Sequence, residues 1–121
     1  GGKNLNTIII SQFSNEAASK TKGLILREHI EKFLSANEEC ITVDFKGITR
    51  FASPFFNNSF SALALIYGFS VIRSIHLINI DEVGRMTYET SLSNAEMVSD
   101  HPEQINQINQ IIENTPKKVM L

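Results

Sequence analysis

Three short runs of β-branched and aliphatic residues divide the chain, at residues 7–10, 40–45 and 74–80. Each run is followed by residues with the spacing of an amphipathic helix, so the pattern predicts strands alternating with helices. Such an alternation favours a parallel sheet with helical crossovers. We therefore predict an α/β fold with a mixed or mostly parallel sheet of about four strands, packed with about four helices. The run at 74–80 is almost continuously apolar, which predicts a central strand covered on both faces.

The helix boundaries are indicated by capping residues. Ser19 or Thr21 can cap a first helix, whose apolar face repeats at Leu26, Ile30, Phe33 and Leu34 and which ends near residues 36–37. Asn79 or Asp81 can cap a third helix after the last strand. Asp100 or His101, before Pro102, predicts a final helix to about Glu113, followed by a tail at 115–121.

Ser53 and Pro54 predict the clearest helix start in the chain. A serine side chain can accept a hydrogen bond from the free amides of the first turn, and proline suits the first helical position. Apolar residues then repeat at helical spacing as far as Tyr67, and Gly68 stands where a left-handed C-terminal cap is favoured. We expect a helix from Pro54 to Tyr67, with Ser53 as its N-cap.

Composition predicts one domain without a strong electrostatic preference for a partner. The 121 residues are 42% hydrophobic and 20% charged, with a net charge of -2, so we expect no nucleic-acid or membrane partner. The single cysteine, Cys40, excludes an internal disulfide and suits a reducing cytoplasm, and we expect no leader segment before the first strand. Gly1 and Gly2 could be a remnant of an expression tag and are excluded from the fold prediction. The oligomeric state is not predicted.

The sequence lacks the common enzyme motifs. It contains no glycine-rich phosphate loop, no paired-histidine metal motif and no nucleophile elbow, and its three histidines are scattered. We predict a protein without catalytic residues, metal ions or cofactors.

Candidate binding residues gather where the second predicted strand leads into the second helix. Ligands of α/β sheets bind beyond the carboxyl ends of the strands, and this junction offers Asp44, Thr49, Ser53, Asn57 and Asn58. Asp44 is either a buried acceptor that fixes the loop after its strand or a contact for a partner or a cation. Asn57 and Asn58 form either an exposed polar stripe or a binding edge.

Ser53 and Phe55 have alternative interpretations of the same kind. Ser53 is either a plain N-cap or a phosphorylation site, since phosphate would be favoured next to the free amides of a helix start. Phe55 lies on a different face of the predicted helix from Phe56 and Phe60. We therefore expect Phe55 to be partly exposed and to act as a docking residue.

The segment at residues 43–48, followed by residues 51–58, resembles the signature of the STAS-like family, bacterial domains that are similar to the STAS domains of anti-sigma factor antagonists. The pattern is a strand ending in Asp-Phe, a small turn, and a serine that opens a helix. The closest resemblance covers residues 40–68, and the order of elements agrees over most of the chain. It implies a STAS-like single domain over residues 1–121.

In the antagonists, the serine at the start of this helix is phosphorylated by a kinase of the histidine-kinase-like ATPase type, and this phosphorylation controls partner binding. By resemblance, Ser53 is the phospho-acceptor candidate. Where many relatives have a second serine and an acidic residue, this chain has Phe55 and Ser59. The resemblance implies a non-catalytic regulatory protein-interaction module; a small-ligand or nucleotide sensor that uses the same strand-end crevice is the alternative.

Overall fold

The computed structural model describes residues 6–100 of the chain. Its strands are β1 (Thr7–Ile9), β2 (Thr42–Asp44) and β3 (His76–Ile78). Its helices are α1 (Lys20–Ser35), α2 (Ser53–Phe56), α3 (Ala62–Tyr67), α4 (Phe69–Arg73) and α5 (Glu82–Ser99), with a 3-10 helix η1 (Ile10–Gln12) and a π-helical segment η2 (Asn57–Ser61). The predicted α/β class is confirmed, with three strands among the described residues where about four were expected.

The sheet is parallel throughout residues 6–100, in the order β1-β2-β3. Ile8, Val43 and Leu77 stand side by side in its register and are buried. Their neighbours in each strand point to the other face and are half-buried or exposed. Because crossovers between parallel strands are almost always right-handed, consecutive strands place their connecting helices on one face. One covered face therefore explains the burial of alternate residues.

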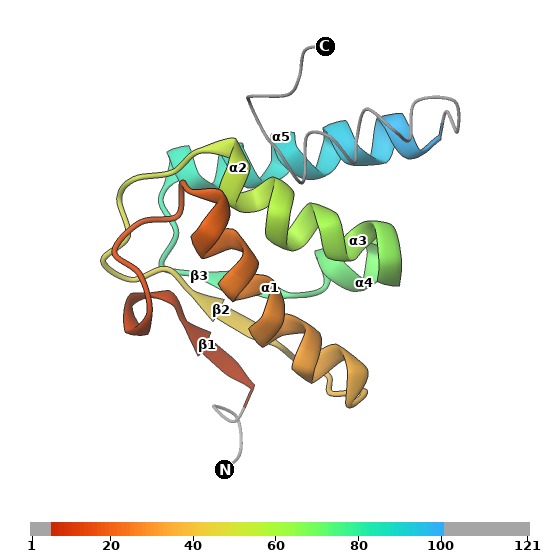
Figure 1. Cartoon of the computed structure of the whole chain (residues 1–121), viewed down its shortest axis with the longest axis horizontal. Coiled ribbons are helices and arrows are strands. Elements are labelled where there is room, and N and C mark those ends of the chain that lie inside the picture. The colour runs from red at the N-terminus through yellow and green to blue at the C-terminus, as the bar shows by residue number, and fades with distance from the viewer. Residues whose placement is uncertain (1–5, 101–121) are drawn as a thin grey trace.

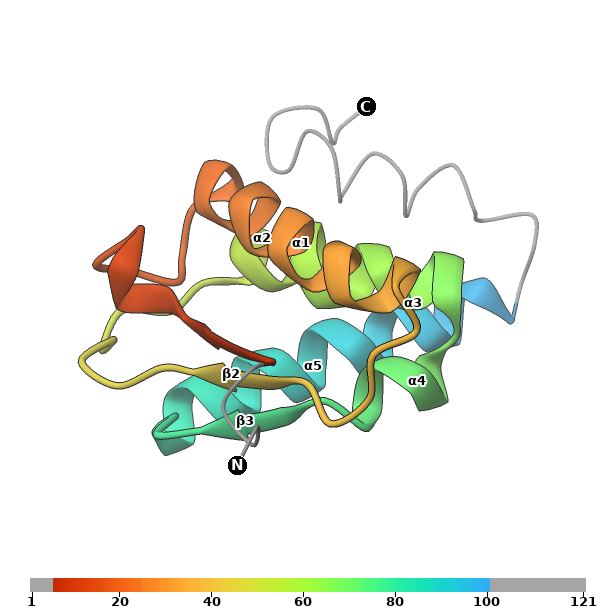
Figure 2. The ribbon, with the colours of Figure 1, turned by 90° about the horizontal axis from the view of Figure 1, so that it is seen from below.

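The helices form a layer whose middle member is one continuous helical stretch, residues 53–67, made of α2, η2 and α3. α1 packs on one side of this stretch and α5 on the other (Figure 1). Figure 2 shows α1 and the middle stretch running together past the sheet. The predicted helix from Pro54 to Tyr67 is confirmed in extent. Gly68, with φ 106° and ψ 145°, ends it, although this ψ lies outside the left-handed helical conformation expected of a C-terminal cap.

The prediction that residues 74–80 form a central strand covered on both faces is wrong. Within residues 6–100, β3 pairs only with β2 and lies at the edge of the sheet. His76 and Ile78 are exposed, and only Leu77 between them faces the core. Ile75 is buried just before the strand. The apolar run therefore includes both the strand and the buried residue that precedes it, and composition alone does not separate the two.

The predicted caps are confirmed at two helices. The Ser19 hydroxyl accepts a hydrogen bond from the Lys22 amide, and the Asp81 carboxylate accepts one from the Gly84 amide. Asp100 is the C-cap of α5. Whether it also begins a last helix stays a prediction, because the residues that follow it lie outside the described part of the chain. His101, the helix expected to reach Glu113, the tail at 115–121 and the first two glycines lie outside the described residues.

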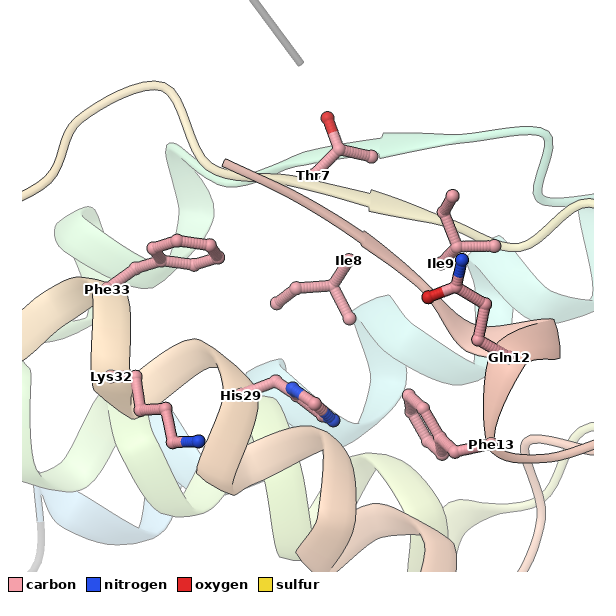
Figure 3. Close-up of a pocket in the computed structure, with 8 residues that line it drawn as sticks. All are labelled: Thr7, Ile8, Ile9, Gln12, Phe13, His29, Lys32 and Phe33. Atoms are coloured by element: carbon pink, nitrogen blue, oxygen red, sulfur yellow. The ribbon is translucent and has the colours of Figure 1, made fainter. Parts of the chain in front are cut away.

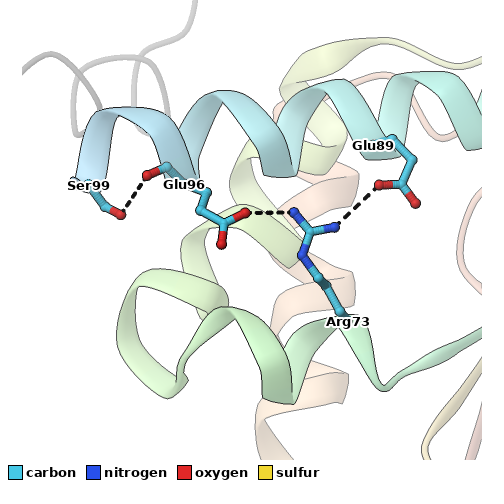
Figure 4. A network of polar contacts seen from close by, with 4 residues as sticks. All are labelled: Arg73, Glu89, Glu96 and Ser99. Carbon is cyan, nitrogen blue, oxygen red and sulfur yellow. Dashed lines mark hydrogen bonds and ion pairs between the residues drawn. The ribbon is translucent and has the colours of Figure 1, made fainter. Parts of the chain in front are cut away.

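α4, which the sequence pattern does not predict, is tied to α5 through one arginine. Arg73 lies between Glu89, at 3.3 Å, and Glu96, at 2.9 Å (Figure 4). The hydrogen bond that Arg73 donates to Glu96 and the two carboxylate charges raise the pKa of Arg73 despite partial burial. Exposed pairs of this kind contribute little to stability. In the described part of the chain, no helix is both long and apolar enough to cross a bilayer.

Candidate functional site

The helix starts and the strand ends meet at one edge of the molecule, which we call the carboxyl rim and define as residues 16–19, 44–53 and 79–81. In a parallel sheet with helical crossovers, each strand ends at the edge where the next helix begins. α1 begins there after Ser19, α2 after Ala52 and α5 after Asp81. The rim is therefore the place where polar loop residues and free helix amides come together.

Asp44 fastens the ends of two strands at the rim. Its Oδ1 accepts a hydrogen bond from the Lys46 amide at 2.9 Å and another from Asn79 Nδ2, also at 2.9 Å. The chain then turns back, with the Ile48 amide donating to the Phe45 carbonyl and Gly47 at φ 84°. The side chain is half-buried, and its bonds match the interpretation of Asp44 as an acceptor that fixes the following loop. A role in partner binding stays a prediction.

The loops that precede α1 and α2 are joined by main-chain hydrogen bonds. Ala17 forms an isolated parallel bridge with Phe51: its amide donates to the Arg50 carbonyl at 2.9 Å, and its carbonyl accepts from the Ala52 amide at 3.2 Å. This bridge holds Ala52 in an extended conformation, with φ -156° and ψ 157°. The position of the bridge therefore decides where α2 starts.

The prediction that Ser53 is the N-cap is wrong by one residue. Ala52 occupies the cap position, Ser53 is the first helical residue and Pro54 the second. The first turn closes with the Phe55 amide donating to the Ala52 carbonyl at 3.3 Å. The Ser53 side chain is exposed and makes no capping hydrogen bond. The hydroxyl is therefore not used to start its own helix.

Phe55 and Asn58 are not surface residues, contrary to prediction. Phe55 is 0% exposed and meets the Phe56 ring edge-on, with centroids 5.2 Å apart. Asn58 is also 0% exposed, and its Nδ2 donates to the Pro54 carbonyl at 2.7 Å. Both side chains are buried because α1 and α5 cover opposite sides of the middle helix. Neither can touch a partner without a rearrangement of the helices.

Asn57 belongs to a polar contact between the middle helix and α5. Its Oδ1 accepts a hydrogen bond from the Ser91 hydroxyl at 2.7 Å, and the hydroxyls of Ser91 and Ser61 lie 2.6 Å apart. Since Ser91 has one hydroxyl proton and gives it to Asn57, Ser61 must donate to Ser91. Sequence reasoning missed Ser61 and Ser91; the only available indication was their small polar side chains on otherwise apolar helix faces.

This polar contact coincides with the π-helical turn at residues 57–61. π-helical turns are rare in proteins overall, but those that occur are often found at functional sites. The Oδ1 of Asn58, inside this turn, is buried and has no hydrogen-bond partner among the described residues. The first half of the middle helix is thus less regular than its second half.

Glu16 organises the part of the rim that leads into α1. One carboxylate oxygen accepts hydrogen bonds from the amides of Ala18 and Ser19, and the other accepts the Ser19 hydroxyl at 2.9 Å. Partial burial alone would raise the pKa of Glu16, but these hydrogen bonds, with the charge of Arg50, outweigh it and lower the pKa. No cluster of three His, Cys, Asp or Glu side chains that could hold a metal ion occurs within residues 6–100.

The predicted site residues therefore divide into three groups. Thr49 and Ser53 are exposed on the rim, with Asp44 half-buried beneath its turn. Phe55 and Asn58 are in the interior. Asn57 is half-buried and faces α5. The exposed part of the site is smaller than predicted and is concentrated between Thr49 and Ser53.

Comparison with known protein families identifies a match. Residues 22–85 match a family described as a STAS-like domain of unknown function. The match covers more than half of the chain and runs from α1 to the first turn of α5, so it includes the exposed part of the rim. No curated protein and no solved structure gives a significant match.

Proposed function

Because the chain belongs to the family of STAS-like domains of unknown function, we propose that it is a non-catalytic regulatory module that binds a protein partner through its carboxyl rim. The resemblance to antagonists further suggests that a partner serine kinase of the histidine-kinase-like ATPase type modifies Ser53. We place this phosphorylation in the cytoplasm, because a chain with a single cysteine, Cys40, suits a reducing compartment.

The observation that supports the proposal best is the state of the Ser53 hydroxyl. It is exposed at the first position of a helical stretch that runs to Tyr67, and it makes no capping hydrogen bond. A kinase could therefore reach it without breaking a structural contact. Thr49 and Arg50, which precede it, are exposed as well and would form the surface that a partner contacts.

The modification is an ordinary phosphoryl transfer. The Ser53 oxygen attacks the γ-phosphorus of ATP, the bond to the β-γ bridging oxygen breaks, ADP leaves, and the hydroxyl proton passes to a base of the kinase. The product carries about two negative charges beside the start of a helix, where the partial positive charge of the helix dipole favours them. Since the rim carries three carboxylates and two cationic side chains, phosphorylation would make this binding surface more strongly negative.

The structure offers a route by which the first turn could influence α5. Asn57 lies one turn after Ser53, and the Asn57 amide closes on the Ser53 and Pro54 carbonyls. The Asn57 side chain in turn accepts the Ser91 hydrogen bond from α5. A partner that displaces the first turn of α2 would therefore also disturb the contact between the middle helix and α5.

A small-ligand or nucleotide sensor has less support than a protein-binding module. Such a sensor needs polar groups that are free to converge on a ligand. At the rim, Asp44 and Glu16 are already engaged with amides and with the Asn79 and Ser19 side chains. A thermal-shift screen against nucleotides tests the alternative, since a ligand that binds only the folded state raises the melting temperature.

Incubation with ATP and candidate partner kinases, followed by mass spectrometry of peptides, tests the proposal directly. We expect one phosphate on Ser53, and none in the Ser53→Ala variant. Thr49→Ala is the matched control, because it removes a neighbouring exposed hydroxyl and should leave phosphorylation unchanged. Phosphate confined to other residues would remove Ser53 from the mechanism.

Partner binding is measured with the same kinase by calorimetry. The Ser53→Asp variant, which carries part of the charge of phosphoserine, is expected to change the dissociation constant at least tenfold relative to the unmodified protein. An equal affinity for both would contradict a phosphorylation switch, and the absence of any complex would contradict the protein-interaction role with that kinase.

A further inference from the structure

The two edges of the sheet differ in how their main-chain groups are satisfied. At the β3 edge, the Leu77 carbonyl accepts a hydrogen bond from Arg85 Nη2 at 3.3 Å, so a side chain of α5 covers it. At the β1 edge, the Asn6 carbonyl accepts from the Thr42 amide, which shows that Asn6 faces β2. Alternate residues of a strand face opposite neighbours, so the main chain of Thr7 points outward. No strand among residues 6–100 pairs with this edge.

A pocket lies directly beside the open edge, between β1 and α1. It has a volume of about 170 Å³ and opens among Ile8, Phe13, Phe33, His29 and Lys32. Figure 3 shows Ile8 pointing from β1 toward α1, with His29 and Phe13 on one side and Phe33 on the other. The rings of Phe13 and His29 stack with centroids 5.2 Å apart. The pocket therefore has largely apolar walls with three nitrogen-bearing side chains, Gln12, His29 and Lys32.

The size of the pocket favours a single side chain over a whole ligand molecule. Sites for drug-sized ligands are roughly 300–1,000 Å³. When a strand is added to a sheet edge, its main chain bonds to the edge and every second side chain points to the covered face. An added strand beside β1 would direct such a side chain toward the helical layer, where this pocket lies.

We infer that the open edge of β1 and the pocket beside it form a second protein-binding site, which takes an extended peptide segment of a partner protein with an apolar side chain and, two residues away on the same face, an acidic one. The apolar side chain enters between Phe13 and Phe33. The acidic one meets Lys32, which is exposed and has no ion-pair partner within residues 6–100. Glu38, which accepts a hydrogen bond from Asn6, gives the amino end of β1 the opposite charge.

A second copy of this chain fits the site less well than a peptide does. Ile8, which β1 directs to the covered face, and Ile10, which begins η1, are 6% and 0% exposed in their own core. A second β1 strand therefore has no free side chain to place in the pocket. Pairing of two copies would also bring the two Lys32 side chains to the same interface, where like charges repel.

The test uses a phage-displayed library of random linear heptapeptides, selected against the full chain. We expect enriched peptides with an apolar residue two positions from Asp or Glu, and amide hydrogen exchange at Thr7 slowed at least tenfold by a synthetic copy of an enriched peptide. Lys32→Glu should weaken its binding at least tenfold. Lys46→Glu, an equal charge reversal at an exposed turn of the rim, should change it less than twofold.

Other outcomes of this test overturn the inference. A library that yields no enriched sequence, peptides that protect rim amides around Ser53, or binding that is insensitive to Lys32→Glu would each exclude the site. Protection of Thr7 without peptide that rises with protein concentration, together with a dimer in ultracentrifugation, would assign the edge to a second copy. Since Ser53→Ala leaves this edge intact, the result is independent of the proposed phosphorylation.

Discussion

α1 and α2 begin side by side at the carboxyl rim, but they use serine in opposite ways. At α1, Ser19 is the N-cap: its hydroxyl accepts from the Lys22 amide at 3.2 Å and donates to Glu16 at 2.9 Å. At α2, the cap is Ala52, and the Ser53 hydroxyl makes no capping hydrogen bond. One serine is committed to the structure, whereas the other is available for chemistry.

The comparison teaches that exposure and hydrogen bonding separate a capping serine from a candidate for modification. Phosphorylation of Ser19 would break its bonds to Glu16 and to the first turn of α1. Phosphorylation of Ser53 would break no cap. The bridge between Ala17 and Phe51 links the two helix starts, so a change at one start is expected to affect the other.

The largest expected effect comes from the point at which the two helix starts touch. A Cβ atom on Gly23 would lie 2.5 Å from the Phe55 carbonyl oxygen, which is main chain and cannot turn aside. Gly23→Ala should therefore destabilise the protein by about 1–3 kcal/mol in urea unfolding, the usual cost of overpacking. Thr21→Ala, an exposed change in the same turn, should stay within about 0.5 kcal/mol. Equal stability of both variants would mean that α1 and α2 do not pack as described.

The next prediction compares the contributions of Ser19 and Ser53 to the stability of the protein. Ser19→Ala removes an N-cap and should lower the free energy of unfolding by about 1 kcal/mol. Ser53→Ala should change it by less than about 0.5 kcal/mol, because no capping bond is lost. Urea unfolding of both variants at the same pH provides the measurement. A loss at Ser53 as large as that at Ser19 would show that Ser53 caps α2 in solution.

The acidity of Glu16 gives a pH-dependent version of the same contrast. The pKa of Glu16 is lowered from its ordinary value of 4.5 in the folded protein, where amides and the Ser19 hydroxyl stabilise the carboxylate. A lowered folded pKa contributes stability that is fully present above the unfolded pKa and is lost as pH falls through the folded pKa.

Glu16→Gln should therefore be less stable than the unmodified protein at pH 7, by about 0.3–1 kcal/mol, the range for a charge at a helix start. The difference should shrink below pH 4.5 as the carboxylate of the unmodified protein becomes protonated. Stability curves from pH 2 to 7 check this. Glu28→Gln, an exposed change later in α1, is the control, and a difference that grows toward low pH would contradict the assignment.

The sequence predicted the elements of the fold better than their surroundings. Short apolar runs and helical spacing depend on local residues, so β1, β2 and the middle helix were found with nearly correct bounds. Whether a helix is covered on one side or two depends on the number and order of its neighbours. Phe55 and Asn58 were therefore placed at the surface although α1 and α5 enclose them.

The candidate site was limited by contacts between distant segments. Ser19 and Ser53 are equally good caps by residue type, and Pro54 even favours Ser53. The main-chain bridge from Ala17 to Phe51 decides the matter by holding Ala52 extended at the cap position. The pocket beside β1 was not predicted either, because it needs β1 at the edge of the sheet and η1 turning beside α1.

The smallest expected effect tests whether the start of α2 is suited to negative charge. Ser53→Asp places a carboxylate at the first helical position and should stabilise the protein by about 0.3–1 kcal/mol at low ionic strength. The gain should fall when salt is added, because exposed charges are screened over about 10 Å at 0.1 M ionic strength. Thr49→Asp adds the same charge before the start of the helix and should show little of this stabilisation. If Ser53→Asp destabilises the protein and salt relieves the loss, the rim repels negative charge, and phosphate at Ser53 would have to act by opening the start of α2.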